Sequence, residues 1–186
     1  MFSRTNLLIV LMALAGALLG LFATSHFVQL PSRPIPPGVT PLHIGDTRTD
    51  LQLPGTDGTS HSLSDWNGKL VLLNFWATWC GPCRAEMPLL DKVGTHLASS
   101  GLRVIGVAID NDDAVDDFLR NHPVNYPILL GSGAKTDPSV VFGDTRNLLP
   151  YSVLIGRDGT ILAQHAGSFS ANSLTDWLST HLAAAN

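Results

Sequence analysis

The chain contains two cysteines, Cys80 and Cys83, and only Gly81 and Pro82 separate them. Three chemistries could use such a pair: thiol–disulfide exchange, half of a metal site, or a structural crosslink. Exchange requires one thiol that is ionised and accessible, and a second thiol close enough to resolve the mixed disulfide. The choice among the three depends on the elements that position the two sulfurs.

The elements around the pair favour exchange. An apolar run ends at Trp76 and predicts a buried strand, and a helix is expected to begin near Cys80. The free N–H groups and the dipole of a helix N-terminus favour the thiolate form of Cys80. Cys83 follows one turn later on the same face, within bonding reach and more protected. Pro82 is tolerated in a first turn, and Gly81 leaves room for a substrate.

The other two chemistries fit the sequence less well. A structural zinc needs four ligands, and there is no second closely spaced cysteine pair or histidine pair. A copper site with two cysteines and His165 as a third ligand remains an alternative. A crosslink that closes so short a loop constrains little. We therefore expect a redox pair, with no metal and no cofactor.

The overall charge excludes one class of partner. The 186 residues carry a net charge of −4, and the 11 lysines and arginines are dispersed. Nucleic-acid binding needs a concentrated basic face, so we expect no nucleic-acid partner. The length suffices for one domain of ordinary size and an additional segment.

The N-terminal residues 1–30 predict a signal-anchor. Residues 7–23 carry no charge and follow Arg4. A membrane-spanning helix needs about 17–25 residues, whereas the apolar part of a signal peptide has about 7–15. We expect a single pass through the inner membrane, with the chain beyond residue 30 in the periplasm or outside the cell. Cleavage near Ser25 and secretion is the alternative.

The segment 31–41 contains five of the twelve prolines. Such a composition predicts a semi-rigid, extended spacer. From residue 42 onwards the hydrophobic pattern becomes that of a globular domain, which we expect to extend over residues 42–186.

The pattern within this domain predicts an α/β fold. Strands alternate with helices in the first part, and a strand hairpin and a final helix complete it, so we expect a central mixed sheet flanked by helices. A short β-hairpin should precede the sheet. The strands are expected at 51–53, 60–63, 69–76, 102–109, 126–130, 151–155 and 160–164, and the helices at 80–97, 113–121 and 170–184.

Residues 71–83, VLLNFWATWCGPC, resemble the thioredoxin active site, and residues 83–88, CRAEMP, resemble the TlpA/ResA/CcmG branch of thioredoxin-like proteins. Members of that branch are membrane-anchored and work outside the cytoplasmic membrane. The resemblance covers roughly residues 42–183. It implies a thioredoxin-like fold in which Cys80 is the nucleophile and Cys83 the resolving thiol.

The same resemblance assigns supporting residues. Pro150 matches the cis-proline that lies beside the cysteines, and Trp79 is expected to form an exposed rim of the substrate site. Where thioredoxin has a buried aspartate beneath the cysteines, this chain has Asn74, which cannot take the proton of Cys83. Glu86 and the acidic run 110–113 are the candidate proton acceptors. The alternatives are a surface or packing role for Glu86 and, for the run, a helix-cap role with solvated charges.

The resulting hypothesis is a reductant of protein disulfides. Protein thiols and disulfides are the expected substrates, with cytochrome c maturation as a context that the branch suggests, and a membrane electron donor is expected to re-reduce the pair. A disulfide-donating oxidant or an isomerase is the alternative, followed by a copper-binding or chaperone module. A thiol peroxidase would need a Pro-x-x-x-Thr-x-x-Cys arrangement, which is absent around Cys80.

Overall fold

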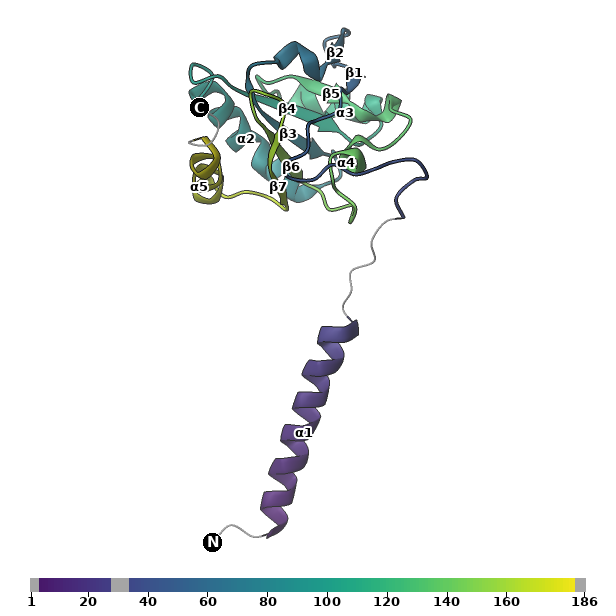
Figure 1. The fold of residues 1–186 in the computed structure, drawn as a ribbon, viewed down its shortest axis with the longest axis vertical. Coiled ribbons are helices and arrows are strands. Elements are labelled where there is room, and N and C mark those ends of the chain that lie inside the picture. Colours follow the sequence, from purple (N-terminus) through teal and green to yellow (C-terminus); the bar gives the residue numbers. More distant parts are fainter. Residues whose placement is uncertain (1–3, 28–33, 183–186) are drawn as a thin grey trace. The chain divides into compact units, whose positions relative to one another are not determined.

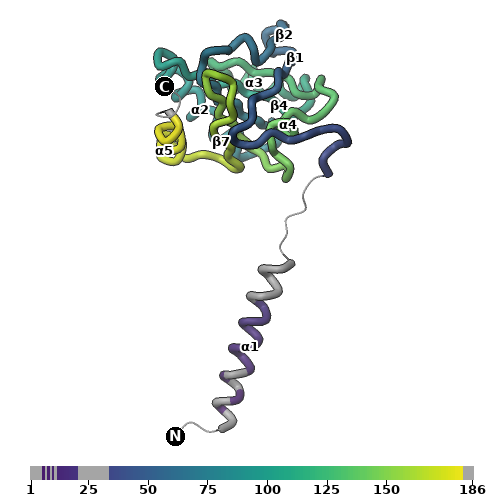
Figure 2. Tube along the Cα trace, in the orientation of Figure 1, coloured from purple at the N-terminus to yellow at the C-terminus, as the bar shows by residue number. Residues whose placement is uncertain are grey.

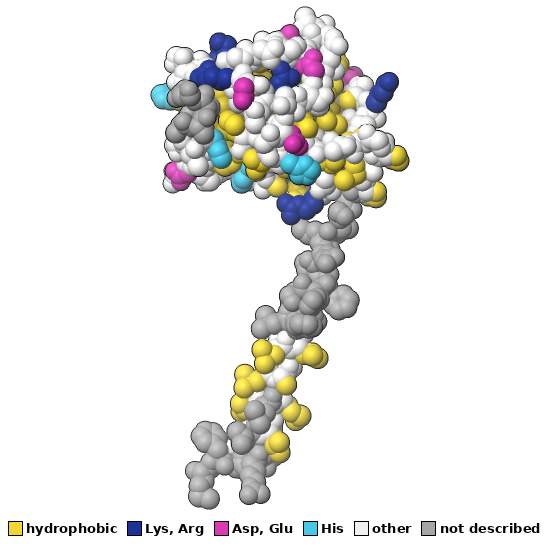
Figure 3. Space-filling model, in the orientation of Figure 1, with side chains coloured by type: hydrophobic (Ala, Val, Ile, Leu, Met, Phe, Trp, Pro, Cys, Tyr) yellow, Lys and Arg dark blue, Asp and Glu magenta, His cyan; other side chains and the backbone are white. Residues whose placement is uncertain are grey.

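A computed structural model describes residues 4–27 and 34–182 (Figure 1), in two separate compact units. The first unit consists of helix α1, Arg4–Phe27. The apolar side chains described on α1 are exposed (Figure 3); they belong to Leu8, Val10, Met12, Leu14, Leu18 and Leu19. Among the described residues, no helix combines the length and the hydropathy needed to cross a membrane. The anchor expected at residues 7–23 is therefore not confirmed.

The second unit begins with a segment that lies along the later sheet. Leu42 N donates to Val141 O, and Arg48 N donates to Gly159 O. Figure 2 shows this early part of the trace beside β7, Ile161–Ala166. A two-stranded antiparallel hairpin follows, β1 Gln52–Pro54 and β2 Ser60–Ser62, as predicted.

The central sheet is mixed, as predicted, and has the strand order β5-β4-β3-β6-β7. Strands β3, β4 and β5 are parallel, whereas β6 runs antiparallel to both β3 and β7. The first four strands in chain order are β3 Leu70–Trp76, β4 Leu102–Ala108, β5 Ile128–Leu130 and β6 Tyr151–Ile155. Each lies within about two residues of its predicted range.

The helices cover both faces of the sheet. The longer ones are α2 Gly81–His96, α3 Asp112–Asn121 and α5 Ala171–Leu182, and all three contribute to one hydrophobic core. Helices α2 and α3 lie on the same face, as expected for successive parallel crossovers of one hand. The hairpin, a 3₁₀ turn at Leu63–Trp66 and the end of α4, Pro138–Val141, cover the other core. The predicted end of the last helix, residues 183–184, lies outside the described residues.

Helix α4 was not predicted. Asp137 caps its N-terminus by accepting from Ser139 N, and Pro138 occupies the first turn. A capping aspartate followed by proline is a sequence signal for a helix start. The helix is only four residues long, so it has no apolar periodicity that would identify it.

Strand β3 is buried along its whole length and supplies both cores. Leu72 and Trp76 belong to the core under α2, while Leu73 and Phe75 belong to the core under α4. Because side chains alternate along a strand, Asn74 shares the face of Leu72 and Trp76. The strand thus places one amide in an otherwise apolar row beneath α2.

Gly106 of β4 allows the sheet and the neighbouring aromatic rings to meet. A Cβ atom there would lie 2.5 Å from Ile128 Cδ1 and 3.2 Å from both Trp76 Nε1 and Tyr126 Cε2. We expect Gly106→Ala to lower the free energy of unfolding by about 1–3 kcal/mol, because the buried rings cannot move aside. Urea unfolding followed by tryptophan fluorescence measures this change.

The matched control is Gly133→Ala, where the only neighbour of an added Cβ is Pro54 Cδ at 4.0 Å. This variant should stay within about 0.5 kcal/mol of the parent. Equal unfolding midpoints for the two variants would show that the close packing at Gly106 is not a constraint.

Candidate active site

The two cysteines form a disulfide at the N-terminus of α2. The sulfurs are 2.00 Å apart, and the Cα atoms are 5.3 Å apart. Cys80 is the N-cap residue of the helix, and its Sγ accepts a hydrogen bond from Cys83 N at 3.2 Å. The predicted placement of Cys80 at a helix N-terminus is confirmed. A sulfur therefore takes the position that a serine or aspartate oxygen usually takes.

The two sulfurs differ in their access to solvent. Cys80 is 5% exposed, whereas Cys83 is fully buried. Trp79, the residue before the first cysteine, is 67% exposed, and Gly81 and Pro82 are exposed as well. Of the two cysteines, Cys80 is therefore the more accessible, and exposed residues precede and follow it.

Pro150 follows a cis peptide bond with Leu149, as predicted. The proline is buried, and its carbonyl oxygen accepts from Gly167 N at 2.8 Å. The loop before it is fastened by the buried carboxylate of Asp144, which accepts from Leu148 N at 2.9 Å. Burial raises the pKa of Asp144, and its hydrogen bonds with the loop oppose that shift.

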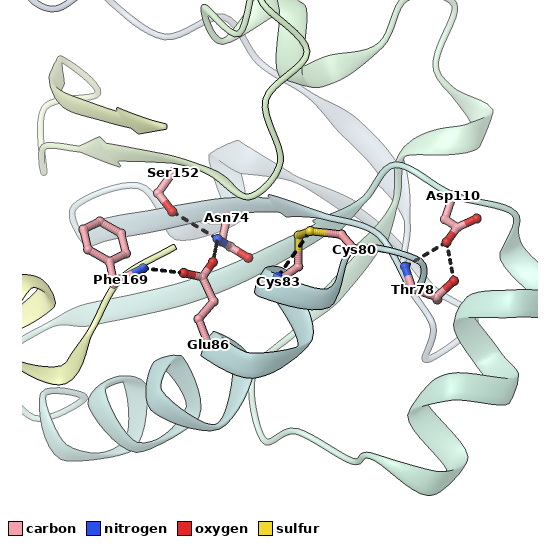
Figure 4. The surroundings of a disulfide bond; sticks show 8 residues. All are labelled: Asn74, Thr78, Cys80, Cys83, Glu86, Asp110, Ser152 and Phe169. Carbon is pink, nitrogen blue, oxygen red and sulfur yellow. Dashed lines mark hydrogen bonds between the residues drawn. A yellow bond between two sulfur atoms is a disulfide. The ribbon is translucent and has the colours of Figure 1, made fainter. Parts of the chain in front are cut away.

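A polar network lies beneath the disulfide (Figure 4). Asn74 Nδ2 donates to Glu86 Oε1 at 2.9 Å and to Ser152 Oγ at 3.0 Å. Phe169 N donates to Glu86 Oε2 at 2.9 Å. Glu86 is only 2% exposed, so the alternative of a surface residue is wrong. Burial raises the pKa of Glu86, while the bonds from Phe169 and Asn74 act in the opposite direction.

One atom of this network lacks a partner within residues 34–182. Asn74 Oδ1 is buried and accepts no hydrogen bond. Figure 4 shows it on the side of the amide that faces Cys83. A buried acceptor without a donor is costly, so its position next to a redox-active sulfur calls for a chemical explanation.

The acidic run 110–113 has structural roles. Asp110 Oδ2 accepts from Thr78 N at 2.8 Å and from Thr78 Oγ1 at 2.5 Å, on the side of the cysteines away from Glu86 (Figure 4). Asn111 caps α3, and Asp112 and Asp113 lie in its first turn. This arrangement supports the helix-cap interpretation of the run and ties the loop before Cys80 to the end of β4.

The structure gives no support to the alternative of a copper site. The described part of the chain contains no group of three or more histidine, cysteine, aspartate or glutamate side chains that could hold a metal ion. His165 instead stacks on Phe169 with ring centroids 4.0 Å apart, and its partial burial lowers its pKa.

Sequence reasoning missed Ser152, Phe169 and Thr78 as parts of the site. Ser152 stands opposite Asn74 in the antiparallel register of β3 and β6, and that register is a tertiary property. A polar residue two positions after Pro150, in a buried strand, was the available signal. Phe169 contacts Glu86 through its backbone N–H, and its residue type therefore does not predict the contact.

Comparisons with known proteins identify the family of the chain. The Redoxin family matches residues 43–178. The thiol-disulfide oxidoreductase ResA of Bacillus subtilis is 31% identical over 135 residues, 72% of this chain and 73% of that protein. The ResA of Bacillus thuringiensis is 30% identical over 138 residues, 74% of this chain and 78% of that protein.

A solved structure extends the comparison to three dimensions. A protein from Chlorobium tepidum assigned as a thiol:disulfide interchange protein DsbE superimposes with a TM-score of 0.68 at 31% identity. The superposition covers 76% of this chain and 99% of that one. The chain therefore belongs to the Redoxin family, as a thioredoxin-fold thiol-disulfide oxidoreductase of the TlpA/ResA/CcmG type.

Proposed function

We propose that this enzyme reduces disulfides of client proteins outside the cytoplasmic membrane. The observation that carries the proposal is the asymmetry of the pair: Cys80 keeps 5% of its surface exposed and follows the exposed Trp79, whereas Cys83 is fully buried on the side of the Glu86 network. An accessible nucleophile and a protected resolving thiol are the two parts that exchange chemistry requires.

The reaction transfers two electrons from the dithiol to the client. The Cys80 thiolate attacks one sulfur of the client disulfide, forms a mixed disulfide and releases the other client sulfur, which takes up a proton. Cys83 then loses its proton and attacks Cys80 Sγ. This step breaks the mixed disulfide and closes the Cys80–Cys83 disulfide, and the second client sulfur leaves as a thiolate and takes up the proton that Cys83 lost.

The N-terminus of α2 serves the first step. In the disulfide form the N–H of Cys83 already points at Cys80 Sγ, at an N···S distance of 3.2 Å. When the pair is reduced, the same N–H group and the helix dipole stabilise the negative charge of the Cys80 thiolate. No rearrangement of the backbone is needed for this.

Glu86 serves the second step as the proton acceptor for Cys83. Its carboxylate is buried three residues after Cys83 and is held by Asn74, whose free Oδ1 faces that cysteine. In the reduced state the thiol of Cys83 can donate to this oxygen, which holds the proton at the entrance to the network. The raised pKa of Glu86 makes its carboxylate a stronger base than an exposed glutamate.

The direction of electron flow and the location complete the proposal. A reductant needs an electron donor, which we place in the membrane, and residues 7–23 would hold the domain there as a tether. This part rests on the sequence of those residues and on the resemblance to the TlpA/ResA/CcmG branch. Apocytochrome c awaiting haem is the client class that the resemblance suggests. A disulfide donor or isomerase is the competing function, because the same pair in its disulfide form could oxidise client thiols.

The first prediction concerns the two cysteines. Cys83→Ser should accumulate mixed disulfides with clients in cells, because the resolving thiol is gone, whereas Cys80→Ser should trap none. Electrophoresis without reductant, followed by a second dimension with reductant, detects the trapped clients. Equal trapping by the two variants would contradict the assignment of Cys80 as the nucleophile.

The second prediction concerns the equilibrium reduction potential of the pair. A client reductant should have a potential near that of thioredoxin, roughly −270 mV, whereas a disulfide donor should approach roughly −120 mV. Equilibration of the full chain in thiol/disulfide buffers, read by tryptophan fluorescence, gives the value. A result at the upper end would replace the reductant with the oxidant.

The third prediction concerns Glu86→Gln. Release of the client from the mixed disulfide should slow by about 10²-fold or more, because the proton acceptor is lost. The parent rate should rise as pH passes through the pKa of Glu86, and the variant should lack this rise. Stopped-flow measurement across pH tests both, with Asp176→Asn, the same change at an exposed carboxylate of α5 away from the site, as the control.

The pH dependence of the free energy of unfolding tests the raised pKa of Glu86 independently of the reaction rate. The folded protein favours protonated Glu86, because burial raises its pKa above the unfolded value. The parent should therefore lose stability relative to Glu86→Gln as pH rises from the ordinary glutamate pKa through the folded one. A difference that is constant across this range would mean that Glu86 does not titrate in the folded protein.

A further inference from the structure

A groove with a volume of about 280 Å³ lies on the flank of α2 that faces α3. Glu86 lies on a different flank of α2, where it contacts the segment before α5. The apolar part of its lining comes from α2, from α3 and from the segment after α3: Met87, Pro88, Phe118, Pro123 and Val124. None of these residues has a role in the chemistry described above.

The residue that follows the redox pair in the sequence belongs to the lining of the groove. Arg84 lines it, directly follows Cys83, and donates its backbone N–H to Cys80 O at 3.1 Å. Lys92 lines its other end, eight residues further along the same helix. At 1.5 Å per residue, Arg84 and Lys92 lie about 6 Å and about 18 Å beyond Cys80 along the axis of α2. A client segment that leaves Cys80 along α2 would therefore pass both cations.

The charges at the rim are unbalanced. Arg84 and Lys92 are exposed, and neither has an ion pair among residues 34–182. The carboxylate of Asp91 also lines the groove, but it is held by Asn125, whose N and Nδ2 donate to it at 2.7 Å and 2.8 Å. His122 stacks on Phe118 with ring centroids 4.4 Å apart. The rim thus holds two cations against one carboxylate, in a chain of net charge −4.

We propose that this groove binds the client segment next to the reacting client cysteine, and that it selects an apolar residue flanked by two acidic residues. The proposal rests on the proposed function, since it concerns the clients of the same cysteine pair. An extended peptide advances about 3.3 Å per residue. Acidic side chains about two and about five residues from the client cysteine would therefore meet Arg84 and Lys92, with the apolar residue above Met87.

The test compares peptides that differ only in charge. Each carries one cysteine as a mixed disulfide with a neutral small thiol. Counted from that cysteine, the third and fourth residues are leucine, and the second and fifth residues are either both glutamate or both lysine. Versions with the same spacing on either side of the cysteine cover both chain directions. The full chain, reduced beforehand, is the enzyme, and kcat/KM is measured for each peptide.

The expected result is a preference of about tenfold for the acidic peptide in one of the two directions, since two partly exposed ion pairs contribute modestly. Lys92→Glu should reduce this ratio, and the double variant Arg84→Glu/Lys92→Glu should invert it. Lys135→Glu is the matched control for Lys92→Glu, because Lys135 is exposed and lies outside the groove lining, and the two substitutions change the net charge by the same amount. This control should keep the parent ratio.

Two further measurements separate this proposal from the proposed function. Every rate is divided by that of the same variant with a small neutral disulfide, which cancels an effect of Arg84 on the neighbouring thiols. Peptides with serine in place of cysteine are titrated onto the disulfide form, so that binding is measured without chemistry. Loss of all disulfide reduction with selective binding intact would overturn only the proposed function.

Equal rates and equal binding for acidic and basic peptides in the parent would overturn the groove proposal. An acidic preference that survives the double charge reversal would do the same, because the selectivity would then come from another surface. Concentration-dependent self-association that the double variant abolishes, without peptide selectivity, would show that a second copy of the chain occupies the groove.

Discussion

The hydrogen bond from Cys83 N to Cys80 Sγ is the interaction on which the site depends. A helix N-terminus needs an acceptor, and here the acceptor is the reactive sulfur itself. That arrangement requires α2 to begin at one defined position. Strand β3, buried on both faces, fixes the approach of the chain, and Asp110 holds the intervening loop through Thr78. The buried strand and the anchored loop thus leave Cys80 slightly exposed and Cys83 fully buried.

Burial of a carboxylate next to this pair is tolerable because the network satisfies it. Each oxygen of Glu86 accepts one hydrogen bond, from Asn74 or from Phe169, and these contacts come from β3 and from the segment before α5. The amide nitrogen of Asn74 donates one hydrogen bond to Glu86 and one to Ser152. Its oxygen is therefore the one buried polar side-chain atom of this network without a partner among residues 34–182, and a protonated Cys83 would supply the missing donor. An aspartate at position 74 would instead place two carboxylates side by side, each raising the pKa of the other.

The parts of the fold that the sequence predicts are those with local signals. The apolar runs of β3 and β4, the hairpin turn and the Cys-Gly-Pro-Cys spacing each identify their element, and the resemblance correctly implied the cis bond before Pro150. The parts that could not be predicted are contacts across the sheet and to backbone groups. Ser152 meets Asn74 through strand register, and Phe169 meets Glu86 through a backbone N–H. A local pattern of residue types predicts neither the register between two strands nor the direction in which a backbone N–H group points.

Helix α2 carries a buried row and an exposed row of residues, and the spacing in its sequence places the two rows on different flanks. Cys83, Glu86 and Leu90 recur at three- and four-residue spacing and are all buried, so this row faces the sheet and the network. Arg84, Pro88 and Lys92 recur every four residues and are exposed, so this row borders the groove toward α3. Substitutions in the exposed row leave the buried acceptors of the other row in place. If the proposed client groove and the proposed proton acceptor are both in use, client recognition can change through one flank of α2 without disturbing the carboxylate on the other.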